Sequence, residues 1–358
     1  MEDETIESLS IKLCTVLDDI GVTEKLINFR RYVCTLREVY FASLNDHNKA
    51  VLHTFGSQME GSTTLGMRSD LDNLCQATWM TAYTELKDCR QTNIDSFLAI
   101  KTTTLCPQFY SLQYVMQLPG NILFPARKES CEFLLLELPI IGCMFMLDEE
   151  DRVVLSNQIY LNSCFQDMIL VHPNDKYHQH GPAQNLNDNE DYVDAVQCPN
   201  LPVECQVLFS RPKPGHWPKK VTITKAKECG VFFIYPGNIG HTFTYNVERS
   251  MVLMNVNYQR NIASRQFIVS TNKIELLLMC DLNIVQMKAY ILTKMIRKQF
   301  LKPIVGDQLS TFHVKTALLF TVEKYPMEIW NTENLVNCVL FSAFSAKTIL
   351  STLYHCRC

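Results

Sequence analysis

At 358 residues, with 47% hydrophobic and 20% charged side chains, the chain has the composition of a globular protein that can bury a large core. Its formal net charge of −4 excludes a surface that is basic overall, so a nucleic-acid partner would require a local basic patch. The acidic start, MEDETIESLSIKLC, is unlike a secretory signal, and the most apolar run, FLLLELPIIGCMFML, is too short to span a bilayer. Fifteen cysteines without a CxxC pair indicate reduced thiols, so we expect a cytoplasmic protein with no membrane partner.

Two helices are predicted in the first 45 residues. The stretch TIESLSIKLCTVL repeats apolar residues at helical spacing, and Gly21 ends the run. The next stretch, TEKLINFRRYVCTLREVYFASL, is predicted to have an apolar face made of Leu26, Phe29, Val33, Leu36 and Tyr40. Three basic residues of the same helix are expected to be more exposed: Arg30, Arg31 and Arg37.

Between about Val51 and Asn257 the pattern changes to short β-rich runs separated by Gly, Pro and Asn. The predicted strands are SFLAIKT, RVVLSNQIYL, DYVDAVQC, VECQVLF, KVTITKA, GVFFIYP and RSMVLMNV. From about Lys273 onward the spacing of apolar residues is helical again. We therefore predict an α+β protein with a mixed lobe over residues 1–258 and a helical lobe over residues 259–358.

A polar stretch, VHPNDKYHQHGPAQNLNDNED, contains His172, His178 and His180. Three histidines this close together are compatible with a metal site or with a solvated loop. Because no cysteine lies nearby, the pattern favours the loop.

The stretch TFGSQMEGSTTLGMRSDLDNL combines a Gly-Ser pair with two aspartates separated by one residue. On a strand, Asp70 and Asp72 would point to the same face, where their repulsion would be relieved by a divalent cation. Carboxylate oxygens suit Mg²⁺ or Mn²⁺. A turn at Gly56 and Ser57 could offer backbone N–H groups and a hydroxyl to a phosphate. Together these residues predict a site for a nucleoside triphosphate.

A third carboxylate for this site is expected from DYVDAVQC. Asp191 and Asp194 have opposite parity on a strand, so only one of them can join Asp70 and Asp72. The alternative is that Asp70 and Asp72 form a solvated strand end and that Asp191 is the last residue of the acidic loop NDNED.

The order Gly-Ser, acid-x-acid and a distant single acid resembles the nucleotidyltransferases of the DNA polymerase β type. More narrowly, FGSQMEGSTTLGMRSDLD, HGPA, DYVDAVQCPNLP, RPKPGHWP and STFHVKTALLFTVEKYPMEIW resemble the Mab-21-like domain family, which includes cyclic GMP-AMP synthase. The resemblance implies a bilobed nucleotidyltransferase fold. A long N-terminal helix would brace a polymerase β-like mixed sheet, and a C-terminal helical lobe would close the cleft.

The resemblance also implies roles for individual residues. Asp70, Asp72 and Asp191 match the catalytic metal ligands, with Asp191 matching better than Asp194. The residues that match nucleotide-binding positions are Gly56, Ser57, Lys288, Thr311 and Phe312.

The implied function is the Mg²⁺- or Mn²⁺-dependent joining of ATP and GTP into a cyclic dinucleotide signal in innate immune sensing. A nucleic-acid trigger is expected to be double-stranded RNA, because the zinc insertion of the vertebrate DNA sensor is absent. Basic residues that could contact such a duplex are Arg30, Arg31, Arg37, Lys213, Lys219, Lys220, Lys225 and Lys227. The pattern favours the alternative, in which these basic residues form a solvated surface.

Some residues depart from the family pattern. Asn73 replaces an apolar residue, Phe312 replaces a tyrosine, and the segment ERSMVLMNVNYQRNIASRQ diverges. Relatives continue beyond YHCRC, so we expect a further C-terminal segment. These departures favour the alternative function, a catalytically silent interaction or scaffold protein that still binds nucleotide.

Overall fold

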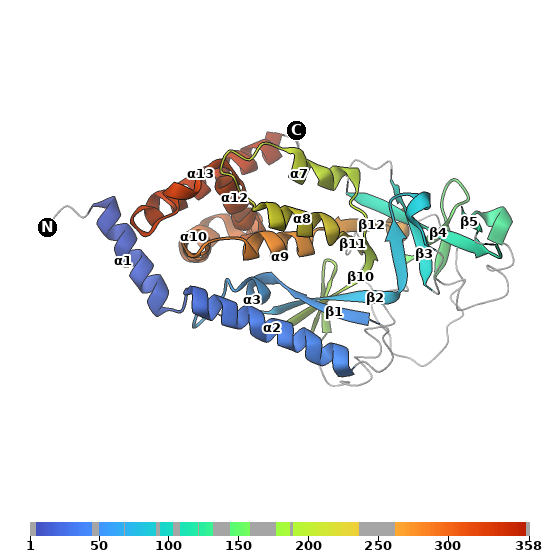
Figure 1. Cartoon of the computed structure of the whole chain (residues 1–358), viewed down its shortest axis with the longest axis horizontal. Helices are drawn as coiled ribbons and strands as arrows, with labels where there is room; N and C mark the ends of the chain where they lie inside the picture. Colours follow the sequence, from blue (N-terminus) through green and yellow to red (C-terminus); the bar gives the residue numbers. More distant parts are fainter. Residues whose placement is uncertain are drawn as a thin grey trace.

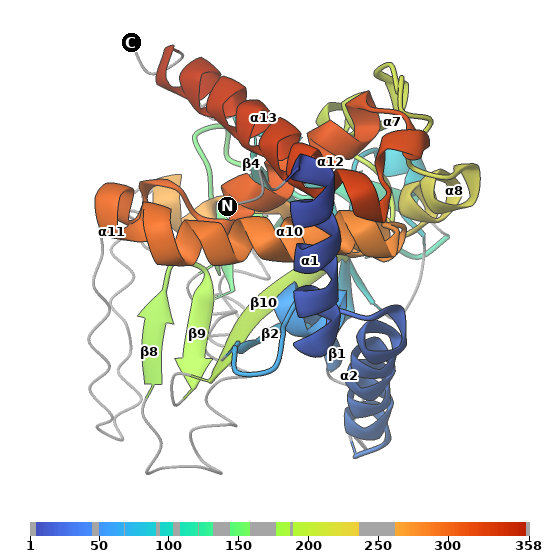
Figure 2. The same cartoon turned by 90° about the vertical axis from the view of Figure 1, so that its left-hand side faces the viewer.

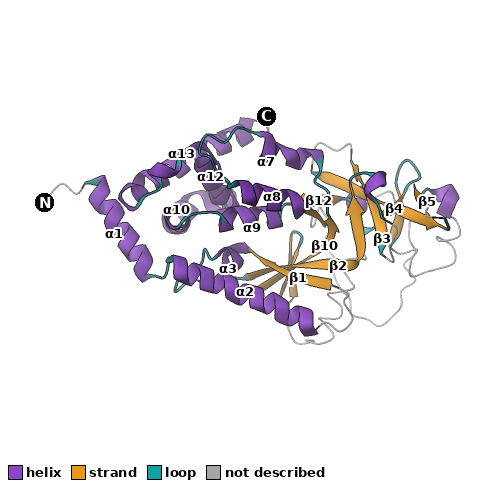
Figure 3. Ribbon diagram, in the orientation of Figure 1, coloured by secondary structure: helices purple, strands orange, loops and turns teal. Residues whose placement is uncertain are grey.

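The computed structural model describes residues 5–44, 50–67, 69–90, 94–102, 108–120, 122–131, 144–157, 177–186, 189–235 and 262–355. Figures 1 and 3 show a mixed sheet packed together with helices, which confirms the prediction of an α+β protein. The described strands are β1 (Ala50–Phe55), β2 (Leu71–Tyr83), β3 (Asp95–Lys101), β4 (Phe109–Leu118), β5 (Ile122–Pro125), β6 (Phe145–Leu147), β7 (Val153–Leu155), β8 (Tyr177–His180), β9 (Ala183–Leu186), β10 (Glu190–Cys198), β11 (Val231–Ile234) and β12 (Phe267–Ser270).

Strand β2 is the centre of the sheet. It pairs antiparallel with β1, and it pairs in parallel with β10 along its first half and with β3 at its end. The described strands follow the order β1-β2-β3-β4-β12-β11-β10-β9-β8. Because β2 also pairs with β10, the six strands β2, β3, β4, β12, β11 and β10 form a closed ring. The closure fixes β2 and β10 side by side where the predicted acidic residues lie.

The described α-helices are α1 (Ile6–Asp19), α2 (Glu24–Leu44), α3 (Gly56–Glu60), α7 (Val207–Ser210), α8 (Lys220–Glu228), α9 (Asn272–Cys280), α10 (Ile284–Ile296), α11 (Lys302–Val305), α12 (Thr311–Lys324) and α13 (Leu335–His355). Although α1 is N-terminal, it packs against α10 and α13 (Figure 2). A hydrogen bond of 3.1 Å from the Val336 backbone N–H to the Ser10 hydroxyl contributes to that contact. The N-terminal helix and the C-terminal helices are therefore one packed group.

The predicted division at residue 258 falls between described stretches and stays a prediction. Strand β12 follows that position in the chain, and it pairs with β4 and β11 of the sheet. The main core lies between sheet and helices and includes Phe97, Leu112, Phe233, Phe267 and Tyr290, all almost fully buried. No described helix alone is long and apolar enough to cross a membrane; α9 and Ile284–Val305 meet that criterion only jointly, across a 120° bend.

Two predicted strands are wrong. KVTITKA forms helix α8, and VECQVLF forms a 3-10 turn (Val203–Gln206) followed by α7. In α8 the side chains of Thr222 and Ala226, four residues apart, are buried on one face. Packing of that face outweighs the β-propensity of its valine, threonine and isoleucine residues. RSMVLMNV lies outside the described residues, and of RVVLSNQIYL only Val153–Leu155 is a described strand.

The polar histidine-containing stretch is more regular than predicted. Residues 177–186 form a hairpin of β8 and β9, in which His178 pairs with Asn185. His172 lies outside the described residues. The prediction of a solvated loop is therefore wrong for the part that forms the hairpin.

Helix α2 forms where predicted, but its orientation is reversed. Phe29 and Tyr40 of the predicted apolar face are 59% and 60% exposed. Arg30, Arg31 and Arg37 face the protein instead. The arginines turn inward because backbone carbonyls and acidic side chains there need donors.

Candidate functional site

Two neighbouring parallel strands bring the predicted acidic residues together. Asp191 on β10 pairs in register with Asp72 on β2, and Asp70 directly precedes β2. Carboxylate oxygens of these three residues all lie within 4.8 Å of one another. Asp191 also accepts a hydrogen bond of 2.8 Å from the Asn185 amide, which holds its carboxylate in place. Within the described residues this is an all-oxygen cluster suited to a hard divalent cation.

The three carboxylates repel one another. The pKa of Asp72 is raised from 3.8 to about 6, first by burial and then by the charges of Asp70, Asp191 and Glu60, while Lys315 opposes the increase. This is the signature of like charges held together in a partly desolvated place. A bound cation would reverse that cost, so the electrostatics of the cluster favour a metal.

The Gly-Ser turn lies directly against Asp72. In the β1–β2 pair Phe55 is opposite Asp72, so Gly56 follows at the same end of the sheet. Gly56 has φ +67°, and a Cβ there would lie 1.7 Å from the Asp72 Oδ2 atom. Only glycine fits this position. The contact explains why Gly-Ser precedes Asp-x-Asp in the sequence: the turn and the acidic strand form one structural unit.

Lys294, rather than the predicted Lys288, lies at this turn. The Lys294 ammonium donates to the Ser57 hydroxyl over 2.9 Å and to the Ser62 hydroxyl over 3.3 Å. The Lys288 ammonium is buried elsewhere, where it contacts the Asp18 carboxylate at 2.8 Å and the Cys14 carbonyl. The two lysines are six residues apart on α10, so they extend from different sides of the helix. The assignment of Lys288 to the nucleotide site is therefore wrong.

Sequence reasoning missed a buried charge network beside the turn. Glu60 ends α3 and is 3% exposed. Lys315 of α12 contacts Glu60 at 2.7 Å and Glu275 of α9 at 3.5 Å. Burial lowers the pKa of Lys315, but the two glutamates outweigh it, so the net pKa is raised and the lysine stays charged. Glu60 and Lys315 do lie within two stretches that the family resemblance includes, GSQMEG and STFHVKT. Nothing in the sequence, however, shows that these two side chains contact each other.

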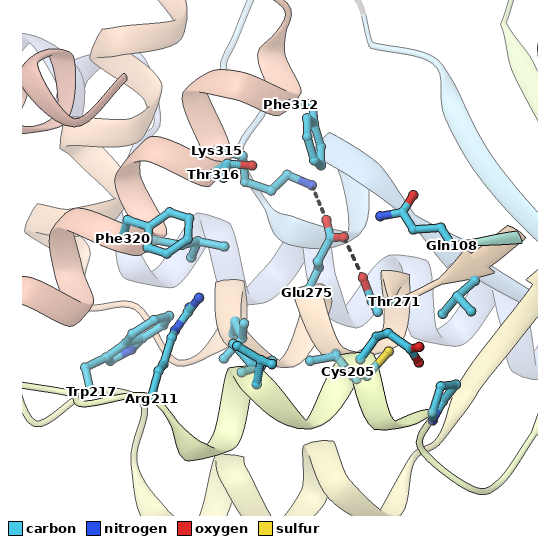
Figure 4. Close-up of a pocket in the computed structure, with 18 of the residues that line it drawn as sticks. Gln108, Cys205, Arg211, Trp217, Thr271, Glu275, Phe312, Lys315, Thr316 and Phe320 are labelled. Atoms are coloured by element: carbon cyan, nitrogen blue, oxygen red, sulfur yellow. Dashed lines mark hydrogen bonds and ion pairs between the residues drawn. The ribbon is translucent and has the colours of Figure 1, made fainter. Parts of the chain in front are cut away.

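A pocket of about 390 Å³ is lined in part by two members of this network, Lys315 and Glu275 (Figure 4). Lys315 and Phe312 from α12 border it, and Thr271 and Glu275 contribute from the opposite side. The Thr271 hydroxyl donates to the Glu275 carboxylate over 3.1 Å. Further lining residues are Gln108, Tyr110, Glu204, Cys205, Leu208, Arg211, Trp217, Thr316 and Phe320. The wall is largely apolar with a few convergent polar groups, as is typical of small-molecule sites.

The other predicted binding residues begin helix α12. Ser310 caps the helix together with His313, and Thr311 is the first helical residue. Phe312 is 59% exposed and borders the pocket, so its ring is free to stack on a planar ligand. The structure thus places Phe312 at the pocket, together with Lys315, whereas Thr311 begins the helix and is not one of the residues that line the pocket.

Two residues whose placement the sequence left open are now located. Asn73, which is 2% exposed, accepts a hydrogen bond of 2.7 Å from Arg37, so its buried amide has a partner. Asp194 lies opposite Cys75 and points away from the acidic cluster, as its parity predicts. Burial raises the pKa of Asp194 to about 7. Asp191 is therefore the third acid of the cluster.

Several basic residues proposed for a duplex are occupied by the protein itself. Arg30 donates to the Thr63 carbonyl and Arg31 to the Glu60 carbonyl. Lys213 and Lys219 form ion pairs whose partners are Glu323 and Asp281. These contacts leave the exposed lysines of α8, Lys220, Lys225 and Lys227, as the remaining candidates from that set.

The chain matches no protein-family model and no curated protein. The resemblance to the Mab-21-like family therefore stays a prediction, and the functional argument depends on the geometry of the site.

Proposed function

We propose that the protein is a metal-dependent nucleotidyltransferase with a polymerase β-like catalytic core. The single observation that carries the proposal is that the carboxylate cluster of Asp70, Asp72 and Asp191 lies beside the Gly56–Ser57 turn, where Asp72 is in close contact with Gly56. A turn that can hold phosphate, directly against a carboxylate cluster that can hold divalent cations, is what phosphoryl transfer requires. We propose, as part of the same hypothesis, that the chain is bilobed and that its sheet is of the polymerase β type.

The donor set fits the implied metal. Three carboxylates and no nitrogen or sulfur ligand in the described cluster favour Mg²⁺ or Mn²⁺ over zinc. When bound, such ions supply charge neutralisation at the phosphates and acidify an attacking hydroxyl. Asp70, Asp72 and Asp191 would hold them.

The remaining roles follow from position. Ser57 and Lys294 are placed to hold phosphate oxygens, because the hydroxyl and the ammonium are already 2.9 Å apart at the turn. Phe312 would stack on a base entering the pocket. Lys315 lies between pocket and turn, where its two glutamate contacts fix its ammonium. We propose ATP and GTP as substrates and a cyclic dinucleotide as product.

A catalytically silent scaffold that binds nucleotide is the second candidate. The observation that favours it is that Lys294 and Lys315 both contact protein groups, namely the Ser57 hydroxyl and the Glu60 carboxylate. Such contacts stabilise the fold whether or not catalysis occurs. On this alternative the acidic cluster would bind metal and nucleotide without turnover.

The test is product formation. Purified protein is incubated with ATP, GTP and Mn²⁺, with and without duplex RNA or DNA, and nucleotide products are separated and identified. The double variant Asp70→Asn/Asp72→Asn removes the cluster, and Asp19→Asn, an exposed aspartate of α1, is the matched control. A dinucleotide made by the wild type and the control but not by the double variant supports the enzyme. Nucleotide binding without product under every condition supports the scaffold.

A further inference from the structure

The exposed side of α2 is an uncharged apolar stripe. It consists of Phe29, Tyr32, Val33, Leu36, Val39, Tyr40 and Ser43. The six large residues among them are between 47% and 61% exposed, whereas Ile27 and Cys34 on the inner side are 3% and 8% exposed. Figures 1 and 2 both place α2 at the edge of the molecule.

The inner side of the helix holds this orientation firmly. Arg31 contacts the carbonyls of Glu60 and Met279, and Arg37 contacts Asn73 and Glu190. Rotating α2 to bury the stripe would break these bonds and leave buried polar groups unpaired. Rotation of α2 therefore cannot bury the stripe against the described residues without loss of these charged contacts.

The spacing of the stripe is that of a helix that pairs with another helix. Phe29, Tyr32, Leu36, Val39 and Ser43 alternate in steps of three and four, the repeat that keeps one seam facing a partner. We propose that α2 is a dimerisation helix that packs antiparallel against α2 of a second copy of this chain, with the two-fold axis at Leu36.

Two features of the stripe favour a second copy over another occupant. An antiparallel two-fold axis at Leu36 places Phe29 opposite Ser43 of the second copy, Tyr32 opposite Tyr40 and Val33 opposite Val39. The bulky Phe29 therefore meets the smallest residue of the stripe, the other positions pair like with like, and no charges are opposed. A parallel pair would set Phe29 against Phe29 and leave a gap at Ser43.

The exposed area of the stripe is also large enough for a specific dimer interface. From the exposed fractions, the stripe offers on the order of 600 Å² per copy. Two copies would bury about 1,200 Å², the lower limit of a specific interface. A patch of about 600 Å² is at the upper end of what a monomer leaves exposed.

The first experiment measures mass in solution. The full chain is analysed by light scattering after gel filtration at about 50 μM. The test variant is Tyr32→Glu/Leu36→Glu, and the matched control is Leu340→Glu/Phe344→Glu, which places the same charges on an exposed side of α13. Circular dichroism melts check that both variants fold. Because the readout is mass, the result does not depend on whether the protein is an enzyme.

We expect the wild type and the control to have twice the chain mass of 41.3 kDa. The test variant is expected to be monomeric, with a dimer dissociation constant raised at least about 100-fold, because each charge is buried twice in a two-fold interface. A monomeric wild type would overturn the proposal, and so would a dimer that the test variant leaves intact. A monomeric wild type that binds neutral lipid vesicles through the stripe would also overturn it and assign the stripe to a membrane surface.

The second experiment tests the orientation of the helices. A chain with Phe29→Cys is mixed with a chain with Ser43→Cys, treated with a short bismaleimide, and the linked peptides are identified by mass spectrometry. A link between positions 29 and 43 that appears only in the mixture supports the antiparallel pair. A link of position 29 to itself in the Phe29→Cys chain alone overturns it.

Discussion

Replacing Asp72 by asparagine should make the metal-free protein more stable. Asp72 is packed beside Asp70 and Asp191, with oxygens of all three within 4.8 Å. Ionisation of Asp72 is therefore unfavourable in the folded state, and its pKa is raised from 3.8 to about 6 by burial and by its acidic neighbours. Asparagine keeps the shape of the side chain and removes the charge.

The size of this gain in stability follows from the pKa of Asp72. An increase from 3.8 to about 6 costs the folded protein about 3 kcal/mol once Asp72 is ionised. We expect Asp72→Asn to recover about 2–3 kcal/mol of unfolding free energy at pH 7.5. Unfolding entropy for a chain of this length is about 0.75 kcal/mol per degree, so the melting temperature should rise by about 3 °C.

The stability difference between Asp72→Asn and the wild type depends on pH. Because the folded state holds the Asp72 proton more tightly, the stability of the wild type falls as the pH rises from about 4 to about 6, and the cost is complete above that range. The advantage of Asp72→Asn should therefore be largest above pH 6 and disappear near pH 4. Asp19→Asn, at an exposed aspartate, should show no such dependence.

Thermal melts in EDTA and in Mn²⁺ complete the assay. Mn²⁺ at a hundred times its dissociation constant should stabilise the wild type by about 2.7 kcal/mol and should stabilise Asp72→Asn much less. If Asp72→Asn melts at or below the wild-type temperature in EDTA at pH 7.5, the carboxylates do not repel one another as argued. The case for a metal at this cluster would then lose its electrostatic basis.

Three further substitutions test the surroundings of the cluster. Gly56→Ala should cost at least about 3 kcal/mol in urea unfolding, whereas Gly66→Ala, also at positive φ but with open space around it, should cost about 1–2 kcal/mol; equal losses would contradict the close contact at Gly56. Lys315→Met should destabilise the protein by about 3–5 kcal/mol in the same urea unfolding assay, because it leaves the buried Glu60 carboxylate without its cationic partner. Phe312→Ala should weaken nucleotide binding in equilibrium dialysis by about 5- to 100-fold without changing the melting temperature. Phe344→Ala, an equally exposed phenylalanine on α13, should leave binding unchanged, and a loss in both variants would argue against stacking.

Much of the candidate site could be predicted from local pattern. Parity on a strand correctly separated Asp191 from Asp194, and the adjacency of Asp70 and Asp72 needed only the alternation of side chains. The placement of Lys288 failed because α10 contains two lysines, Lys288 and Lys294, and the sequence pattern does not distinguish them. Only the packing of α10 against α1 and the turn shows that Lys294 contacts Ser57 while Lys288 contacts Asp18.

The sequence by itself determined the elements whose signals are local: the two N-terminal helices, the acidic strand pair and the helical C-terminal part from about Lys273 onward. The tertiary structure decided what each element faces. KVTITKA became helix α8 because packing of Thr222 and Ala226 outweighed β-propensity, and the arginine side of α2 turned inward because it meets carbonyls and Glu190. Periodicity shows that a helix has two unlike faces, but which face is buried depends on partners far away in the chain.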